Sequence, residues 1–288
     1  MKIVTDSATD TELLLESEIE IPVVPLRVKL GDNEYRDKID LTPDAFYALL
    51  EKTDKLPVTS QPSPGEFAKI YREIAKEDPE ILSIHLSSGL SGTYNSAVLG
   101  AEMVPEANVT VVDTKTLSAA AGWQVMAAVR GLDLGWTKER ILAKMKEIAD
   151  ATTSIYTLKD LKYLIHGGRI SHIKGLIASV LKIKPIIGVH KQLGNYTQEG
   201  QEFTYGKALS KLADIVQNGV KSMETVRVQV VHTGNPGGAQ ILRDKIDSML
   251  KCNWKPIGQI SYVLGAHTGP SMVGVGFARE AVFSDLLG

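Results

Sequence analysis

Short apolar runs alternate with helix-like stretches over the first half of the chain. Residues 80–86, EILSIHL, and 108–114, NVTVVDT, read as buried strands, and helix-like stretches follow both. Over 137–151 the apolar positions Ile141, Leu142, Met145 and Ile148 recur at helical spacing, so this stretch predicts an amphipathic helix. Strands that alternate with helices predict a mainly parallel sheet that is covered on both faces.

Local signals fix several element boundaries. Thr42 followed by Pro43 predicts a helix start, and Thr137 predicts another. The stretch 63–66, SPGE, has the spacing of a capping box with proline at the first helical position. The stretch 31–33, GDN, predicts the turn of a hairpin.

The second half has a different pattern. It predicts helices at 175–183 and from 207 onward, a turn cluster at 194–200, and strands at 225–234, 257–269 and 271–278. The last two strands follow each other closely enough to predict an antiparallel pair. The change in pattern predicts an α/β chain with two domains, residues 1–155 and 156–288, whose boundary lies near 152–157.

Composition excludes several classes of protein. The chain has 288 residues, of which 43% are hydrophobic and 23% charged, and a formal net charge of −2, which gives no reason to expect a nucleic acid or an anionic membrane as a partner. No apolar stretch is long enough to span a membrane, and the first residues do not resemble a signal peptide. Cys252 is the only cysteine, so a reducing cytoplasm is the expected compartment. The six histidines are scattered without ligand spacing, which predicts no metal site.

Charge is concentrated in one segment. Residues 157–192 contain seven Lys or Arg residues and one acidic residue, Asp160. Such a run is either a solvated face or a docking patch for an acidic or phosphate-bearing partner, and the sequence leaves both open.

The stretch 86–94, LSSGLSGTY, joins a predicted strand to a predicted helix. Ligands bind at such junctions in parallel sheets, and the free N–H groups of the helix favour an anion. The stretch has neither the Lys of a phosphate-binding loop nor a full dinucleotide fingerprint. An uncharged cradle of hydroxyl groups suits a carboxylate better than a phosphate. The alternative is a serine-rich helix cap without a ligand.

Two more junctions are rich in hydroxyl groups. Thr59, Ser60 and Gln61 lie in a predicted extended loop before a helix. His267 and Thr268 lie between a predicted strand and a Gly-Pro turn. A lone histidine is more often structural than functional, but three such junctions in one chain favour a ligand site.

The chain resembles the DegV family, the fatty-acid-binding proteins that serve the bacterial fatty acid kinase. The resemblance runs over essentially the whole length and is carried by VTDSATD at 4–10, VTSQPSPGEF at 58–67, LSSGLSGTY at 86–94, VVDT at 111–114, LKYLIHGGRIS at 161–171 and AHTGPSMVGVGF at 266–277. It implies a three-layer N-terminal domain with a mainly parallel sheet, a two-layer C-terminal domain with a mixed sheet, and a long-chain fatty acid in a tunnel between them.

The resemblance also implies the residues that bind the ligand. Thr59, Ser91 and His267 would bond the carboxylate. Positions in the same motifs would support them: Ser60, Ser88, Gly92, Thr93 and Thr268. The family's C-terminal turn usually reads Gly-Pro-Gly, whereas here Ser271 stands at its third position, which could change the turn around His267.

The resulting functional hypothesis is a carrier without catalysis or cofactor, which presents the carboxylate to a separate kinase that makes acyl phosphate. Arg169 is the predicted docking contact, because it follows two glycines and its planar side chain suits a carboxylate or phosphate. One alternative is a serine hydrolase that uses Ser91, His267 and Asp113, although no GxSxG motif is present. Another is a module that binds a phosphate or a sugar.

Overall fold

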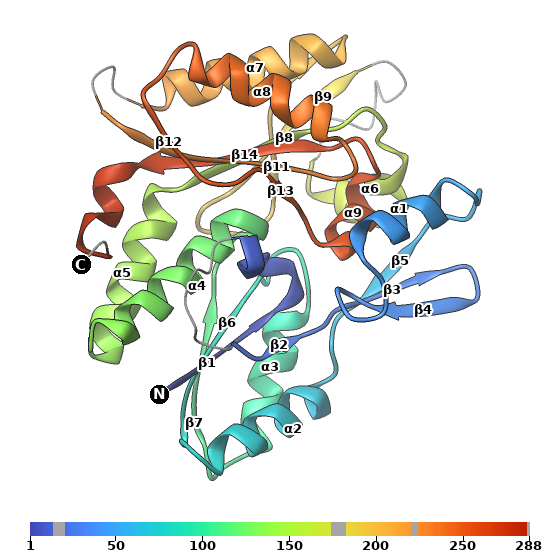
Figure 1. The fold of residues 1–288 in the computed structure, drawn as a ribbon. Helices are drawn as coiled ribbons and strands as arrows, with labels where there is room; N and C mark the ends of the chain where they lie inside the picture. The colour runs from blue at the N-terminus through green and yellow to red at the C-terminus, as the bar shows by residue number, and fades with distance from the viewer. Residues whose placement is uncertain (14–20, 174–182, 221–223, 287–288) are drawn as a thin grey trace.

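The computed structural model describes residues 1–13, 21–173, 183–220 and 224–286 (Figure 1). Within them the chain forms three sheets, of four, seven and three strands. The helix predicted at 175–183 lies outside the described residues, apart from Ile183.

The four-stranded sheet is parallel throughout and has the strand order β2-β1-β6-β7. Its strands are β1 (Lys2–Asp6), β2 (Val23–Val24), β6 (Glu80–His85) and β7 (Asn108–Asp113). One face packs against α2 (Pro64–Ala75) and α3 (Thr93–Glu102), and the other against α4 (Ser118–Asp133) and α5 (Lys138–Ala151). The two faces therefore have separate apolar cores, and the predicted three-layer arrangement is confirmed.

The predicted helix starts are also confirmed. Ser63 and Glu66 form the capping box, since the Ser63 hydroxyl accepts from the Glu66 N–H while the Glu66 carboxylate accepts from the Ser63 N–H. Thr137 caps α5, and Thr42 caps α1 (Pro43–Leu50).

The three-stranded sheet lies at one end of the N-terminal half. It is antiparallel, with β3 (Arg27–Leu30) between β4 (Asn33–Arg36) and β5 (Val58–Ser60). The predicted hairpin is β3–β4. Thr59 and Ser60, which were expected in a loop, lie instead in β5, because this short segment completes the hydrogen bonds of β3.

The seven-stranded sheet is mixed and has the order β10-β9-β8-β14-β11-β12, with β13 also pairing β11. Its strands are β8 (Thr153–Thr157), β9 (Lys184–Val189), β10 (Tyr196–Glu202), β11 (Val226–His232), β12 (Cys252–Trp254), β13 (Gly258–Gln259) and β14 (Val273–Arg279). Helices α7 (Tyr205–Asn218) and α8 (Pro236–Asp247) cover the face turned away from the N-terminal half (Figure 1). This is the predicted two-layer domain. The proposed boundary at 155/156 falls inside β8, and the division into domains stays a prediction.

The prediction of a turn cluster at 194–200 is wrong for most of these residues. Tyr196–Glu202 forms β10, which pairs antiparallel with β9 across an irregularity between Gln198 and Gly200. Polar side chains suit this strand because it forms an edge of the sheet and most of them are exposed. A polar edge strand and a loop have the same composition, which is why the sequence did not separate them.

The prediction of a strand at 257–269 is also wrong. Only Gly258–Gln259 is a strand, and Tyr262–Thr268 forms helix α9 with Ser261 as its cap. Nearly every residue of α9 is buried, so the segment has no amphipathic pattern to separate a helix from a strand. The antiparallel pair predicted near the C-terminus does not form either. Strand β14 lies antiparallel between β8 and β11, while β13 runs parallel to β11.

Candidate functional site

A pocket with polar and apolar walls lies where the carboxyl end of β6 meets β5, α9 and the segment around Arg169. Its four polar side chains are Thr59, Ser91, Arg169 and His267. The remaining lining is apolar or aromatic: Leu26, Leu86, Leu90, Leu117, Tyr196, Val263 and Leu264. We call this the polar pocket. It brings together the three predicted carboxylate-binding residues from segments up to 208 positions apart in the sequence.

Thr59 and His267 are hydrogen-bonded to each other. The distance from Thr59 Oγ1 to His267 Nε2 is 2.7 Å. His267 was expected between a strand and a turn, but it lies in the last turn of α9, opposite β5. Its other ring nitrogen, Nδ1, is buried and has no hydrogen-bond partner among the described residues. A methyl group at Gly167 would lie 2.1 Å from this nitrogen, so glycine is required there.

His267 is neutral at physiological pH. Burial lowers the pKa of its imidazole to about 3, and the charges of Arg169 and His166 act in the same direction. A neutral ring carries one proton, and a buried N–H without a partner is less tolerable than a buried acceptor without one. The favoured tautomer therefore has its proton on Nε2 and donates to Thr59. The Thr59 hydroxyl is then free to donate its own proton into the pocket.

Ser91 belongs to the loop that precedes α3. Its Oγ lies 2.9 Å from Thr93 Oγ1 and accepts from the Thr93 N–H at 3.3 Å. Gly92 lets this loop approach the end of β5, since a methyl group there would lie 2.5 Å from Gln61 Nε2. The predicted supporting residues Gly92 and Thr93 thus determine where the Ser91 hydroxyl lies.

Arg169 brings a positive charge to the pocket. Its guanidinium donates to two backbone carbonyls, from Nε to Leu90 at 3.3 Å and from Nη1 to Gly167 at 2.7 Å. No ion pair with a carboxylate of the described residues accompanies these bonds. The sequence alone suggested a cradle without a cation, because the arginine comes from a segment 78 positions from Ser91. The pocket therefore offers hydroxyl groups and one charge to an anion.

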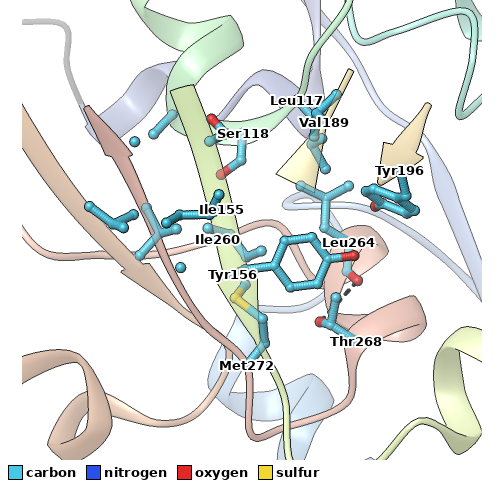
Figure 2. Close-up of a pocket in the computed structure, with 16 residues that line it drawn as sticks. Leu117, Ser118, Ile155, Tyr156, Val189, Tyr196, Ile260, Leu264, Thr268 and Met272 are labelled. Carbon is cyan, nitrogen blue, oxygen red and sulfur yellow. Dashed lines mark hydrogen bonds between the residues drawn. The ribbon is translucent and has the colours of Figure 1, made fainter. Parts of the chain in front are cut away.

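Figure 2 shows an apolar cavity. It adjoins the polar pocket. The two share Leu117, Tyr196 and Leu264. The cavity continues between the seven-stranded sheet and α4, and its other lining residues are Ser118, Ala119, Ser154, Ile155, Tyr156, Val189, Val231, Ile260, Thr268, Met272, Gly274, Val275 and Gly276. Two of its hydroxyl groups are bonded to protein: Ser118 donates to Asp10 at 2.6 Å and Thr268 to the Leu264 carbonyl at 3.3 Å. The Tyr156 hydroxyl is buried and has no hydrogen-bond partner among the described residues. A polar pocket thus lies next to a mainly apolar cavity.

Comparison with known proteins identifies the family. The model of the DegV family, described as uncharacterised proteins, matches residues 1–280. The chain belongs to the DegV family. A DegV domain-containing protein of Staphylococcus aureus is 33% identical over 273 residues, which cover 95% of this chain and 96% of that protein.

Solved structures of DegV proteins have the same fold. A fatty-acid-binding DegV protein of Thermus thermophilus is 29% identical and superposes with a TM-score of 0.87 over 96% of this chain and 99% of the other. A stearic-acid-binding protein of Eubacterium ventriosum is 27% identical, with a TM-score of 0.82 over 97% and 98%. The predicted family and fold class are confirmed.

The supporting residues of this DegV chain lie in different places. Ser60 is exposed on β5, whereas Thr59 faces the polar pocket. Ser88 lines an open outer pocket formed by residues 88–92 and 167–169, and its hydroxyl accepts from Lys115 Nζ at 3.2 Å. Thr268 lines the apolar cavity. Arg169 lines both the polar and the outer pocket, so it stands between the ligand space and the surface.

The proposed hydrolase triad is not assembled. Ser91 pairs with Thr93 and His267 with Thr59, while Asp113 forms an ion pair with Lys115 at 2.8 Å. Across the described ranges, no three His, Cys, Asp or Glu side chains gather as metal ligands. In the same ranges, no helix has the length and apolar character needed to cross a bilayer.

Hydrogen bonds to the backbone hold the turn after His267 and two lysines of the basic segment in place. Ser271 Oγ accepts from the Lys159 N–H at 3.0 Å, so the side chain that departs from the family pattern holds the turn in place. Of the basic residues, Lys184 bonds the Lys159 carbonyl and Lys191 the Asp150 carbonyl. Lys174 and Lys182 lie outside the described residues. The role of this segment stays a prediction.

Proposed function

We propose that this protein binds a long-chain fatty acid, with the carboxylate in the polar pocket and the hydrocarbon chain in the apolar cavity. The observation that carries the proposal is that the two spaces are adjacent and share Leu117, Tyr196 and Leu264 in their linings. A ligand that fills both must have an anionic end and a long apolar part. A fatty acid is the simplest molecule with that form.

The carboxylate would be held by hydrogen bonds and one positive charge. Thr59, oriented by His267, and Ser91 donate hydroxyl protons, and Arg169 supplies the charge. A buried carboxylate is costly unless it is bonded in this way. Because the imidazole is neutral, His267 acts through Thr59 and does not contribute a second charge.

The hydrocarbon chain would supply most of the affinity. About fifteen methylenes at about 0.8 kcal/mol each give about 12 kcal/mol before the costs of association and ordering. The polar pocket then fixes the orientation of the ligand. Two DegV proteins of known structure, from Thermus thermophilus and Eubacterium ventriosum, are described as fatty-acid-binding, which supports the same ligand class here.

The protein itself would be a cytoplasmic carrier without catalysis or cofactor. It would present the carboxylate to a separate fatty acid kinase, which forms acyl phosphate. The outer pocket, which is adjacent to Ser91 and Arg169, is the proposed approach for the kinase. Arg169 would contact the partner there as well as the bound carboxylate.

The ligand is tested by extraction. Lipid extracted from purified protein and identified by mass spectrometry should be a fatty acid of the palmitic to stearic class. Delipidated protein should bind the same acids with saturation. If neither experiment finds a fatty acid, the proposal is wrong.

The kinase step is tested with Arg169→Ala loaded with fatty acid. Acyl phosphate formation by the cognate kinase should fall more than fatty acid affinity does, and salt should weaken the reaction of the unmodified protein because charge complementarity guides the encounter. Lys162→Ala is the matched control, since Lys162 is an exposed cation of the same segment outside both pockets. If acyl phosphate forms at the same rate with Arg169→Ala as with the unmodified protein, the basic segment is only a solvated face and does not dock the kinase.

A further inference from the structure

The floor of the apolar cavity contains two glycines on one strand. Gly274 and Gly276 are alternate residues of β14 and lie on the face turned away from α7 and α8. Glycine weakens a strand interior and marks places where another group approaches closely. Both positions border the space that the proposed hydrocarbon chain would occupy.

The strand register shows what surrounds Gly276. Its direct neighbours across the sheet are Ser154 on β8 and Gln229 on β11. Ser154 has a small side chain, which leaves space in the cavity on that side of Gly276. On the other side the buried Trp123 indole donates to Gln229 Oε1 at 3.0 Å. The cavity lining includes Gly276 but neither Trp123 nor Gln229.

Gly276 is far from the polar pocket. Tyr196, which both spaces share, lies on β10, and β9 and β8 separate that strand from β14. Three strand spacings of ~4.8 Å place the two strands about 14 Å apart. A chain that starts beside Thr59 and Ser91 would therefore reach Gly276 with its distal part.

Protein packing alone does not require glycine at this position. A methyl group on Gly276 would lie 3.9 Å from Ser154 Oγ and 3.9 Å from Trp123 Cη2, which is ordinary van der Waals contact. At Gly274 a methyl group would lie 3.0 Å from Tyr156 Cβ, so there the protein itself is crowded. The missing side chain at 276 leaves room that the surrounding protein does not use.

We propose that Gly276 sets the maximum length of the acyl chain, because its missing side chain leaves room for the last carbons beside Ser154, which also lines the cavity. This inference rests on the proposed function. It names the residue that selects among fatty acids of different length. A side chain at 276 would occupy the place of the last methylenes and favour shorter acids.

The experiment measures the affinities of lauric, myristic, palmitic and stearic acids for delipidated protein. In the Gly276→Ala and Gly276→Val variants, the affinity for the longest acid should fall most, by about fourfold for each methylene that is displaced. The affinity for lauric acid should stay almost unchanged. The same variants should raise the melting temperature of the delipidated protein, because alanine and valine favour a strand more than glycine does. Loss of long-chain affinity together with a gain in stability is not expected from a merely structural role.

Gly237→Ala is the matched control. Gly237 lies in α8, on the other side of the sheet, and a methyl group there meets no atom within 4 Å. Its affinities for the four acids should equal those of the unmodified protein. Circular dichroism should show that each variant is folded, and Gly276→Ala, which adds one methyl group, remains informative if Gly276→Val is not.

The outcomes separate the two proposals. Unmodified protein that binds no fatty acid would overturn the proposed function. Unmodified protein that binds long acids, with Gly276 variants that keep its length profile or weaken every acid equally, would overturn the inference alone. The chain would then run elsewhere, for instance towards the small pocket beside Lys191 that shares Ser154 and Val189 with the cavity.

Discussion

Among the described residues, His85 and His267 both contact hydroxyl side chains, and they differ in how completely their ring nitrogens are bonded. His85, at the end of β6, has no exposed surface. Its Nδ1 lies 3.0 Å from Asp6 Oδ2 and its Nε2 lies 2.7 Å from Ser83 Oγ, which in turn lies 2.7 Å from the Tyr71 hydroxyl. His267 has one bond, to Thr59, and one bare nitrogen.

The difference distinguishes a structural polar network from a candidate binding site. The His85 network is saturated, and Phe67 packs edge-on against its ring, so nothing can reach it. Its Ser-His-Asp composition has the form of a catalytic triad but no access for a substrate. The Thr59–His267 pair is less complete and faces a pocket. A hydroxyl group that can still donate its proton into a pocket, as Thr59 can, marks the site more than residue type does.

The largest expected effect comes from breaking the saturated network. Asp6 accepts from the Ala8 and Leu86 N–H groups, both at 2.9 Å, and bonds His85. Asp6→Ala leaves these groups buried without partners, so the free energy of unfolding should fall by about 3–5 kcal/mol in chemical denaturation. Thr59→Ala should cost far less stability. Equal costs would contradict the contrast between the two networks.

The next effect is on ligand affinity. Ser91→Ala or Thr59→Ala removes one hydrogen bond to a charged group, so fatty acid binding should weaken by about 1.5–3 kcal/mol in calorimetry. Much of the affinity should remain, because the hydrocarbon chain supplies it. Ser60→Ala is the control on the exposed side of the same strand. Unchanged affinity in both pocket variants would place the carboxylate elsewhere.

A smaller effect concerns pH. The pKa of His267 is lowered to about 3 by burial, whereas in the unfolded chain it keeps its usual value near ~6.5. Between these values only the unfolded chain gains a proton, so the stabilising contribution is present above pH ~6.5 and is lost as pH falls towards 3. Relative to His267→Gln, the unmodified protein should lose up to about 2 kcal/mol of unfolding free energy from pH 7 to 5. Parallel curves would mean that His267 titrates normally.

The last prediction is that a serine-directed probe does not react with the protein. A serine-directed fluorophosphonate should not label Ser91, since its hydroxyl lies beside Thr93 and not beside a histidine base. The measurement is intact-protein mass spectrometry after exposure to the probe, with a known serine hydrolase as positive control. Rapid stoichiometric labelling would favour the hydrolase reading.

Much of the N-terminal half could be predicted from the sequence. The caps at Thr42, Ser63 and Thr137 are local, since each side chain bonds a backbone group three residues away. The parallel sheet followed from alternating elements. The family resemblance predicted that Thr59, Ser91 and His267 share one site, and the three residues line one pocket.

The errors fell where local pattern carries no information. Helix α9 is buried on almost all sides, and β10 is a polar edge strand, so neither shows the periodicity of its class. Their conformations depend on neighbours that lie far away in the sequence. The same holds for β5, whose three residues form a strand only because β3 lies beside them.

By itself, then, the sequence determined the elements whose signals lie within a few residues and the family, and it predicted three of the four polar side chains of the polar pocket as carboxylate-binding residues. Only the tertiary structure decided that Arg169 and Ser91 line the same pocket, that His267 bonds Thr59, and that Gly276 lines the apolar cavity. The physical reason is range. Capping and periodicity act within one or two turns of the chain, whereas a pocket is made by side chains that only folding brings together.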